Sequence, residues 1–202
     1  MKLTTEQRLQ KAHVSIMSHR STMAYSSILL VGDSTIRDDI PTACTNGRDV
    51  MYGRAFVEGL SDPELVGLVL HERLHMVYQH AWLWKHLWKE DVQTANQAAD
   101  YVINIEIKDL EKKYSGFIRL PACGLYEDKY RNMDTGEVYR MLKKEQENGG
   151  GSGGEAMDEH KFDELSEEEQ EGVKKEVEQA IRQGALMAGK LGGEQSRTIE
   201  EL

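Results

Sequence analysis

The chain of 202 residues has only two cysteines, Cys44 and Cys123, and they are too far apart in sequence to form a C-x-x-C pair. This scarcity argues against a disulfide scaffold and against a zinc knuckle held by thiolates. No apolar run approaches the ~20 residues that span a bilayer, so we expect no membrane partner. The polar N-terminus lacks the apolar centre of a secretory signal, which favours a cytoplasmic location.

Positive charge is also in short supply. The chain has 25 Lys and Arg residues against 35 Asp and Glu residues, which gives a formal net charge of −10. An acidic surface repels phosphate backbones, so nucleic acid is not an expected partner. The length is sufficient for one domain with an appendage, and no internal repeat is visible. Nothing in the pattern indicates an oligomeric state.

Hydrophobic periodicity and capping residues predict a mostly helical chain with a few short strands. Helices are expected over 4–20, 61–88, 93–113, 135–144 and 166–190. The apolar run 26–31 predicts a buried strand, and Asn46-Gly47 predicts a β-hairpin with arms at 42–45 and 48–52. The resulting expectation is an α+β fold with a small, mostly antiparallel sheet of about three strands.

The glycine-rich run 148–154 divides the predicted helices into two groups. Such a run buries nothing and is costly to order, so residues 146–158 are predicted to form a flexible loop that tolerates changes in length. We expect a core domain over 1–145 before this loop. The helical segment 159–202 after it is expected to pack on the core.

The sequence His71-Glu72-Arg73-Leu74-His75 has the pattern H-E-x-x-H and lies inside a predicted helix. Residues at i and i+4 are neighbours on one helix face, roughly 6 Å apart along the axis, so both imidazoles can bind one Zn²⁺. Glu72 is rotated about 100° from His71 around the helix. It can therefore reach a water activated by the metal without binding the metal, as a general base requires. A small sheet before this helix is the order found in zincins.

A catalytic zinc site needs a third protein ligand and an open position for water. His80 is one candidate, but on a straight helix it points about 180° away from His71, and no glycine follows the motif to bend the chain. His86, a second candidate, falls on the same helix face as His71 and His75 but more than ~15 Å further along a straight helix, so it is also out of reach. Asp100 is the third candidate, because a carboxylate from an adjacent antiparallel helix can complete the site. We expect Asp100 to be the ligand, with Asn104 supporting a ligand by a hydrogen bond. His80 stays open as the alternative.

Two further side chains are candidates for stabilising a tetrahedral intermediate. The phenol of Tyr126 can donate a hydrogen bond, and His160 can close over the site. The alternative for both is an ordinary residue in an exposed loop. An aromatic patch formed by Trp82, Trp84 and Trp88 is expected to pack in the core, with a wall for a substrate or partner as its alternative role.

Several segments recur here in an order that is typical of one family. They are 65–80 with the H-E-x-x-H motif, 98–104 with the pattern A-D-x-x-x-N, 120–126, the glycine-rich run and 185–192. In these segments the chain resembles the bacterial and phage family named the putative metallopeptidase domain, which often precedes a von Willebrand factor A-like domain. The resemblance covers nearly the whole chain. It implies a zincin-like fold with His71, Glu72 and His75 at the metal site, and it favours Asp100 as their partner.

The motif and the resemblance together predict a zinc-dependent peptidase acting on a peptide or protein substrate. Zn²⁺ would polarise the scissile carbonyl and lower the pKa of a water, while Glu72 takes the proton of that water. One rival is a non-catalytic module in which the metal is structural and the tryptophan-rich helix docks a partner. A second rival is a zinc hydrolase that acts on a non-peptide amide. A closed site of four protein ligands would indicate the structural role, and an open site would indicate catalysis.

Overall fold

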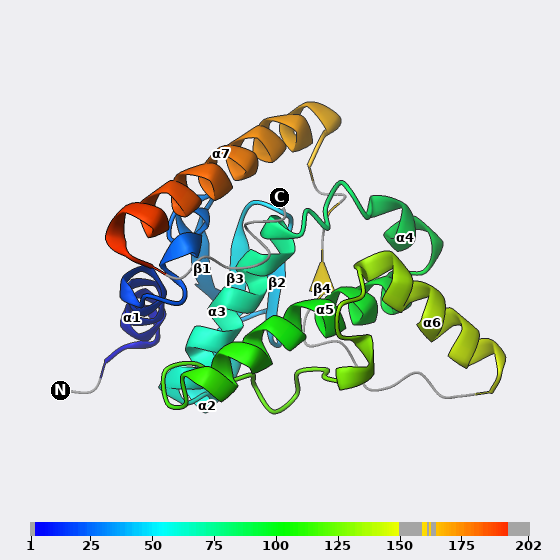
Figure 1. The fold of residues 1–202 in the computed structure, drawn as a ribbon, viewed down its shortest axis with the longest axis horizontal. Coiled ribbons are helices and arrows are strands. Elements are labelled where there is room, and N and C mark those ends of the chain that lie inside the picture. The colour runs from blue at the N-terminus through cyan, green and yellow to red at the C-terminus, as the bar shows by residue number, and fades with distance from the viewer. Residues whose placement is uncertain (1–2, 150–158, 161, 163–164, 194–202) are drawn as a thin grey trace.

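The computed structural model describes residues 3–149, 159–160, 162 and 165–193. Over these residues the protein has an α+β fold, mostly helical, with one small sheet (Figure 1). The α-helices are α1 (Thr5–Ser18), α2 (Arg54–Gly59), α3 (Asp62–Val77), α4 (Lys85–Glu90), α5 (Val92–Lys113), α6 (Thr135–Glu147) and α7 (Glu167–Leu191). The short 3-10 turns are η1 (Met23–Tyr25), η2 (Ile28–Leu30) and η3 (Asp128–Tyr130). The strands are β1 (Ser34–Arg37), β2 (Ala43–Thr45), β3 (Val50–Gly53) and β4 (Glu159–His160).

Capping boxes open α1, α3, α6 and α7 close to where the sequence predicts helix starts. At α3 the box joins Ser61 and Glu64, and Pro63 lies in the first turn, where its missing N–H costs no helical hydrogen bond. At the other end of the chain, α7 is followed by Gly192 with a φ of +70°. Glycine adopts this left-handed conformation without strain, so it ends the helix there as predicted.

The predicted extension of α3 to Trp88 is wrong, because α3 ends at Val77 and α4 is a separate helix. Gln79 has a left-handed φ of +57°. The N–H of His80 donates to the carbonyl of His75 (3.1 Å), and the N–H of Gln79 donates to the carbonyl of Met76 (3.0 Å). These two hydrogen bonds form a Schellman motif, which is normally made with glycine at the left-handed position. The chain therefore bends directly after the H-E-x-x-H motif without a glycine.

The sheet is mixed rather than mostly antiparallel, which corrects the prediction. In the part of the chain that the structure describes, the strand order is β1-β3-β2-β4. The predicted hairpin is present as the antiparallel pair β2 and β3, but β1 pairs with β3 and β4 pairs with β2 in parallel. Parallel pairs join strands that are distant in sequence or separated by a crossover, so no local turn signal predicts them.

The predicted strand over 26–31 is also wrong, since this apolar run forms η2 and the turn before it. The run is apolar because Ile28, Leu29 and Val31 are buried in the core, and not because they belong to a sheet. Gly32 then turns the chain into β1 with a φ of +61°. A Cβ atom at Gly32 would collide with the carbonyl of Arg48, so only glycine fits this crossing.

Two apolar clusters meet around the central pair of helices, α3 and α5. The first cluster combines α1, the sheet, α3 and α7, and α7 contributes Val173, Val177, Ala180, Ile181 and Ala188 to it. The second cluster combines α4, the N-terminal half of α5 and α6. In Figure 1, α1 and α6 lie at opposite ends of the molecule with α3 and α5 between them. Polar side chains at the contact between α3 and α5 are therefore enclosed by apolar packing on both sides.

Trp88 is buried in the second cluster, and the half-buried Trp82 and Trp84 pack against it, which confirms the prediction of core packing. The helix α6 continues to Glu147, so the start of the predicted loop 146–158 is helical. Residues 150–158 lie outside the described part of the chain. None of the described helices has the length and apolarity required to cross a membrane.

Candidate metal centre

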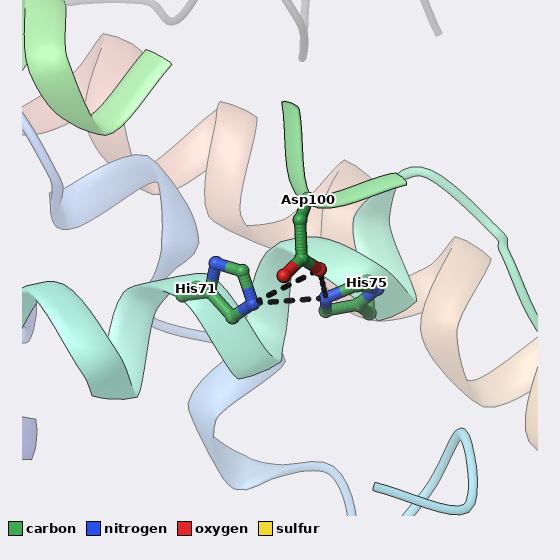
Figure 2. A group of neighbouring side chains, drawn as sticks. All are labelled: His71, His75 and Asp100. Carbon is green, nitrogen blue, oxygen red and sulfur yellow. Dashed lines mark hydrogen bonds and ion pairs between the residues drawn. The ribbon is translucent and has the colours of Figure 1, made fainter. Parts of the chain in front are cut away.

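Three buried side chains from α3 and α5 converge on one another (Figure 2). The Nε2 atoms of His71 and His75 are 3.1 Å apart, and Asp100 Oδ1 is 3.6 Å from each of them. Two nitrogen atoms bound to one tetrahedral zinc at ~2.0–2.1 Å would lie about 3.3 Å apart. The observed spacing therefore fits a single ion with little rearrangement.

Burial supports the same interpretation of this group of three residues. The exposed fractions of His71, His75 and Asp100 are 0%, 1% and 0%. Removing a carboxylate and two imidazoles from water is costly unless hydrogen bonds or a cation compensate. Two imidazole nitrogens and a carboxylate oxygen are also donors that Zn²⁺ accepts. The residues present could thus hold a metal ion, and they include the Asp100 expected from the sequence.

The orientation of His71 is set by Asn104, one turn after Asp100 on α5. Asn104 Nδ2 donates to the carbonyl of Leu125 (2.9 Å), so its Oδ1 atom faces His71 Nδ1 at 2.9 Å as an acceptor. The proton of the neutral His71 ring must then lie on Nδ1. This leaves the lone pair on Nε2, which is the atom that faces the cluster. Asn104 takes the supporting position that the sequence predicts.

The structure separates the two candidates for third ligand. Asp100 lies in the cluster, whereas His80 stands behind His75. His80 Nδ1 is 2.9 Å from His75 Nδ1, on the side of the His75 ring that faces away from the other ligands, and His80 Nε2 is 3.1 Å from Thr135 Oγ1. The bend at Gln79 brings His80 to this position, which a straight helix would not allow.

The electrostatic surroundings keep His75 neutral. Burial is the main cause that holds the pKa of His75 well below its usual range, and the nearby rings of His160, His71 and His80 lower this pKa further. A neutral imidazole is the form that binds a metal, since protonation would occupy the lone pair. The site therefore presents His75 in its ligand form at neutral pH.

Residues 4–201 match the model of a family described as "Putative metallopeptidase domain". The chain belongs to this family. No curated protein and no solved structure matches the chain. The family description and the His-His-Asp cluster agree with each other, because a metallopeptidase requires a metal site and the domain places one set of suitable donors in its interior.

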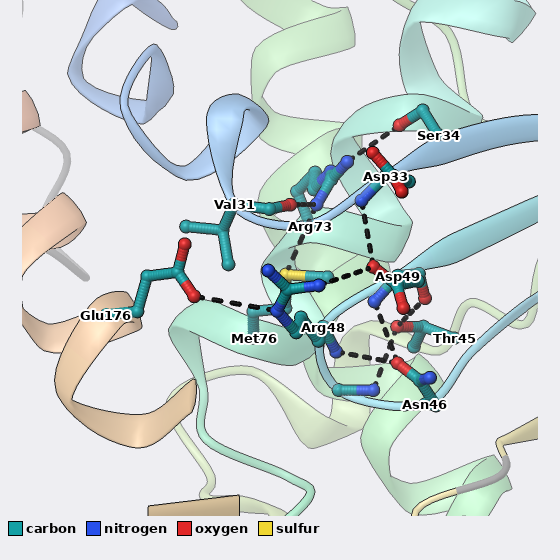
Figure 3. Close-up of polar contacts among 11 residues, drawn as sticks. Val31, Asp33, Ser34, Thr45, Asn46, Arg48, Asp49, Arg73, Met76 and Glu176 are labelled. Atoms are coloured by element: carbon teal, nitrogen blue, oxygen red, sulfur yellow. Dashed lines mark hydrogen bonds and ion pairs between the residues drawn. The ribbon is translucent and has the colours of Figure 1, made fainter. Parts of the chain in front are cut away.

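Within this domain Arg73, the middle residue of the motif, faces the sheet side of α3. Arg73 is completely buried and donates through Nη1 to the carbonyl of Val31 (2.6 Å) and through Nη2 to Ser34 Oγ (2.7 Å), as Figure 3 shows. These bonds fix α3 against the segment that leads into β1. Burial raises the pKa of Tyr52 on β3. The positive charge of Arg73 lowers this pKa, and the negative charge of Glu72 raises it further. Glu72 is also completely buried.

The other two predicted site residues have different surroundings. His160 on β4 is half-buried, and its ring centre is 3.9 Å from that of His75. It also stacks on Phe162, with 5.0 Å between ring centres. The hydroxyl of Tyr126 donates to Asp128 Oδ1 (2.9 Å). The structure therefore brings His160 to the metal centre, whereas Tyr126 would have to leave Asp128 in order to act there.

Two supporting groups of the domain have no signal in the sequence. The carbonyl of Leu125 fixes the amide of Asn104, and any residue could supply that carbonyl. Thr135 was recognisable only as part of a helix start, and its hydroxyl contacts His80 because α6 packs along α5. Both contacts depend on the tertiary arrangement.

Proposed function

We propose that the protein is a zinc-dependent peptidase in which Glu72 is the general base. The convergence of His71, His75 and Asp100 within 4.8 Å, in a family described as a metallopeptidase domain, is the observation that carries this proposal. When bound, Zn²⁺ would polarise the scissile carbonyl and lower the pKa of a water towards ~7.

The three ligands divide the work of holding the ion. His71 and His75 offer nitrogen donors through Nε2, since the second ring nitrogen of each, Nδ1, lies 2.9 Å from a hydrogen-bond partner. Asp100 supplies a negative charge from the neighbouring helix. Three protein ligands leave one tetrahedral position open, which is the arrangement of catalytic zinc sites.

Glu72 is proposed to move the proton. In the H-E-x-x-H pattern a glutamate directly after the first histidine can reach a water on the metal without being a ligand, and Glu72 has this position. It would accept the proton of the attacking water and then donate it to the leaving amine. Its complete burial supports this role, because a carboxylate screened from bulk solvent passes its proton to the leaving group rather than to water.

An oxyanion needs donors on the far side of the scissile carbonyl. Of the two candidates for this role, His160 is the better placed, because its ring lies 3.9 Å from that of His75. Tyr126 remains a candidate only if its hydroxyl is released from Asp128. The substrate class proposed is a peptide or protein, with a cytoplasmic location and no nucleic-acid partner.

The burial of the ligands favours a second candidate function, a metal-stabilised interaction module without catalysis. Exposed fractions of 0% to 1% mean that a peptide could reach the ligands only after neighbouring side chains move. The number of ligands distinguishes the two functions, because a fourth protein ligand on the bound ion would close the site and make the metal structural.

The test is a peptide-library screen with zinc-loaded wild-type protein, followed by Glu72→Gln on any cleaved peptide. Glu72→Gln keeps shape but cannot accept a proton at neutral pH, so we expect retained zinc and a rate loss of at least ~10²-fold. The exposed Glu58 provides the control, since Glu58→Gln should cleave at the wild-type rate. Equal rates for Glu72→Gln and wild type would refute the mechanism. A fully zinc-loaded wild type that cleaves no peptide would favour the interaction module.

A further inference from the structure

One side of the metal centre is supported by a histidine that is not a ligand. His80 Nδ1 lies 2.9 Å from His75 Nδ1, and His80 Nε2 lies 3.1 Å from Thr135 Oγ1. The exposed fractions of His75, His80 and Thr135 are 1%, 0% and 1%. This buried chain of polar contacts runs from a metal ligand on α3, through the turn after α3, to the first residue of α6.

When a metal is bound, the hydrogen bonds from His75 to His80 and from His80 to Thr135 can have only one arrangement of donors and acceptors. His75 uses Nε2 towards the cluster, so its proton must lie on Nδ1. Because His75 Nδ1 is then the donor, His80 Nδ1 must accept. A neutral His80 ring with an acceptor at Nδ1 carries its proton on Nε2, and this N–H donates to Thr135 Oγ1. Each histidine thus has a fixed tautomer.

The backbone after α3 is shaped to make this contact. In a Schellman motif the residue after the left-handed position packs back against the third-last residue of the helix, and these two residues here are His80 and His75. An apolar contact normally occupies that place. Gln79 has a left-handed backbone conformation, which is unfavourable for any residue with a Cβ atom. This conformation turns the chain so that His80 lies under His75.

The same arrangement supports the other histidine ligand. His71 donates from Nδ1 to Asn104 Oδ1, and Asn104 is held in turn by the carbonyl of Leu125. In both cases a ligand imidazole donates to a neutral acceptor that is anchored by a second hydrogen bond. The anchor of His80 is Thr135 on α6, a helix that contributes no residue to the cluster of His71, His75 and Asp100.

We propose that His80 is a positioning residue for the metal, and that its contact with Thr135 makes the metal affinity depend on the packing of α6. The proposal rests on the metal site of the proposed function but not on peptidase activity. His80 accepts from the Nδ1–H of His75 and so holds the ring orientation of His75, and Thr135 accepts from the Nε2–H of His80 and so holds the ring of His80. Hydrogen-bond partners of ligand histidines typically change metal affinity or activity by 10–100-fold when they are removed.

The experiment measures zinc affinity by competition with a chromophoric chelator in wild type, His80→Ala, Thr135→Val and Thr135→Ser. We expect the zinc Kd of His80→Ala to rise ~10–100-fold, and that of Thr135→Val to rise by a smaller factor. Thr135→Ser keeps the hydroxyl and should retain wild-type affinity. The exposed His86 lies on α4, and His86→Ala serves as the control with unchanged affinity.

Thr135→Val is nearly isosteric, and Asp134 rather than Thr135 caps α6, so this variant keeps the test valid even if His80→Ala fails to fold. The double variant His80→Ala, Thr135→Val should bind zinc no more weakly than His80→Ala alone, because the two residues act in series. In the zinc-loaded wild type, ¹⁵N chemical shifts of the imidazoles should show the proton of His75 on Nδ1 and that of His80 on Nε2.

Three results would overturn the proposal. They are a wild-type Kd in the folded Thr135→Val variant, additive effects in the double variant, and ¹⁵N shifts that show His80 bound to zinc. The first two results leave the three-ligand site intact, whereas His80 bound to zinc would change the set of ligands itself. Failure of the wild type to bind zinc at all would instead remove the metal site itself, and the proposed function with it.

Discussion

Replacing Asn104 by alanine removes the hydrogen bond that supports the ligand His71 and leaves the ligand itself in place. The Asn104 side chain accepts a hydrogen bond from His71 Nδ1 and donates one to the carbonyl of Leu125, both at 2.9 Å. Asn104 is completely buried, so Asn104→Ala removes the partner of two interior groups at once. His71 then loses the acceptor that holds its proton on Nδ1 and its lone pair on Nε2.

The expected size of the effect follows from these two bonds. Loss of a hydrogen-bond partner from a ligand histidine weakens a metal site ~10–100-fold, which corresponds to about 1.4–2.7 kcal/mol of zinc binding free energy. The metal-free protein should also lose stability, because each buried polar group that loses its partner costs about 1–3 kcal/mol. We therefore expect a weaker but intact zinc site and a metal-free form destabilised by at least ~2 kcal/mol.

The assay compares zinc affinity by chelator competition and metal-free stability by urea denaturation. Asn96 on the same helix is a matched control, since it is buried and accepts a hydrogen bond from Trp88 Nε1 (2.6 Å) rather than from a ligand. Asn96→Ala should lose stability but keep its zinc affinity. Equal losses of zinc affinity in Asn104→Ala and Asn96→Ala would mean that the site responds to general loosening of α5, and the role assigned to Asn104 would be wrong.

Two further predictions concern stability. Gly67→Ala should destabilise the protein although alanine favours helices, because its Cβ would collide with the carbonyl of Arg119. Gly172→Ala on α7 meets nothing within 4 Å and should stabilise the protein by up to ~1 kcal/mol. Thermal melts that rank the two variants in the opposite order would contradict this prediction. Burial lowers the pKa of His13, so the unfolded chain takes up its proton first as the pH falls through about 6.5. The free energy of unfolding should then decrease towards acid by up to ~1.4 kcal/mol per pH unit for this proton. Urea denaturation at pH 7 and pH 5.5 should show a smaller decrease in His13→Gln than in wild type. An equal decrease in both proteins would exclude His13 as a cause.

Features that depend on neighbouring residues in sequence could be predicted well. The starts of α3 and α7 follow from the serine caps Ser61 and Ser166 with a glutamate three positions later, and the β2–β3 hairpin follows from Asn46-Gly47. The pair His71 and His75 required only the spacing of a helix. Asp100 required one additional assumption, that the next long helix lies antiparallel beside α3.

Features that depend on tertiary contacts could not be predicted. Gln79 carries no local signal for a left-handed turn, and the turn is held in part by His80, whose ring contacts Thr135 on a distant helix. The run 26–31 has the composition of a strand but takes its conformation from packing against α3 and α7. The parallel pairing of β1 with β3 joins segments that no turn connects directly. For the same reason, His80 was predicted to point away from the motif that it supports.

The proposed function rests on one ion bound by His71, His75 and Asp100. A crystal structure of the zinc-soaked protein, with anomalous diffraction measured on both sides of the zinc absorption edge, locates that ion without assuming any activity. We predict one strong peak at ~2.0–2.2 Å from His71 Nε2, His75 Nε2 and a carboxylate oxygen of Asp100, with a fourth position not filled by protein. A peak elsewhere, or a zinc-saturated protein in which these three side chains hold no ion, would contradict it.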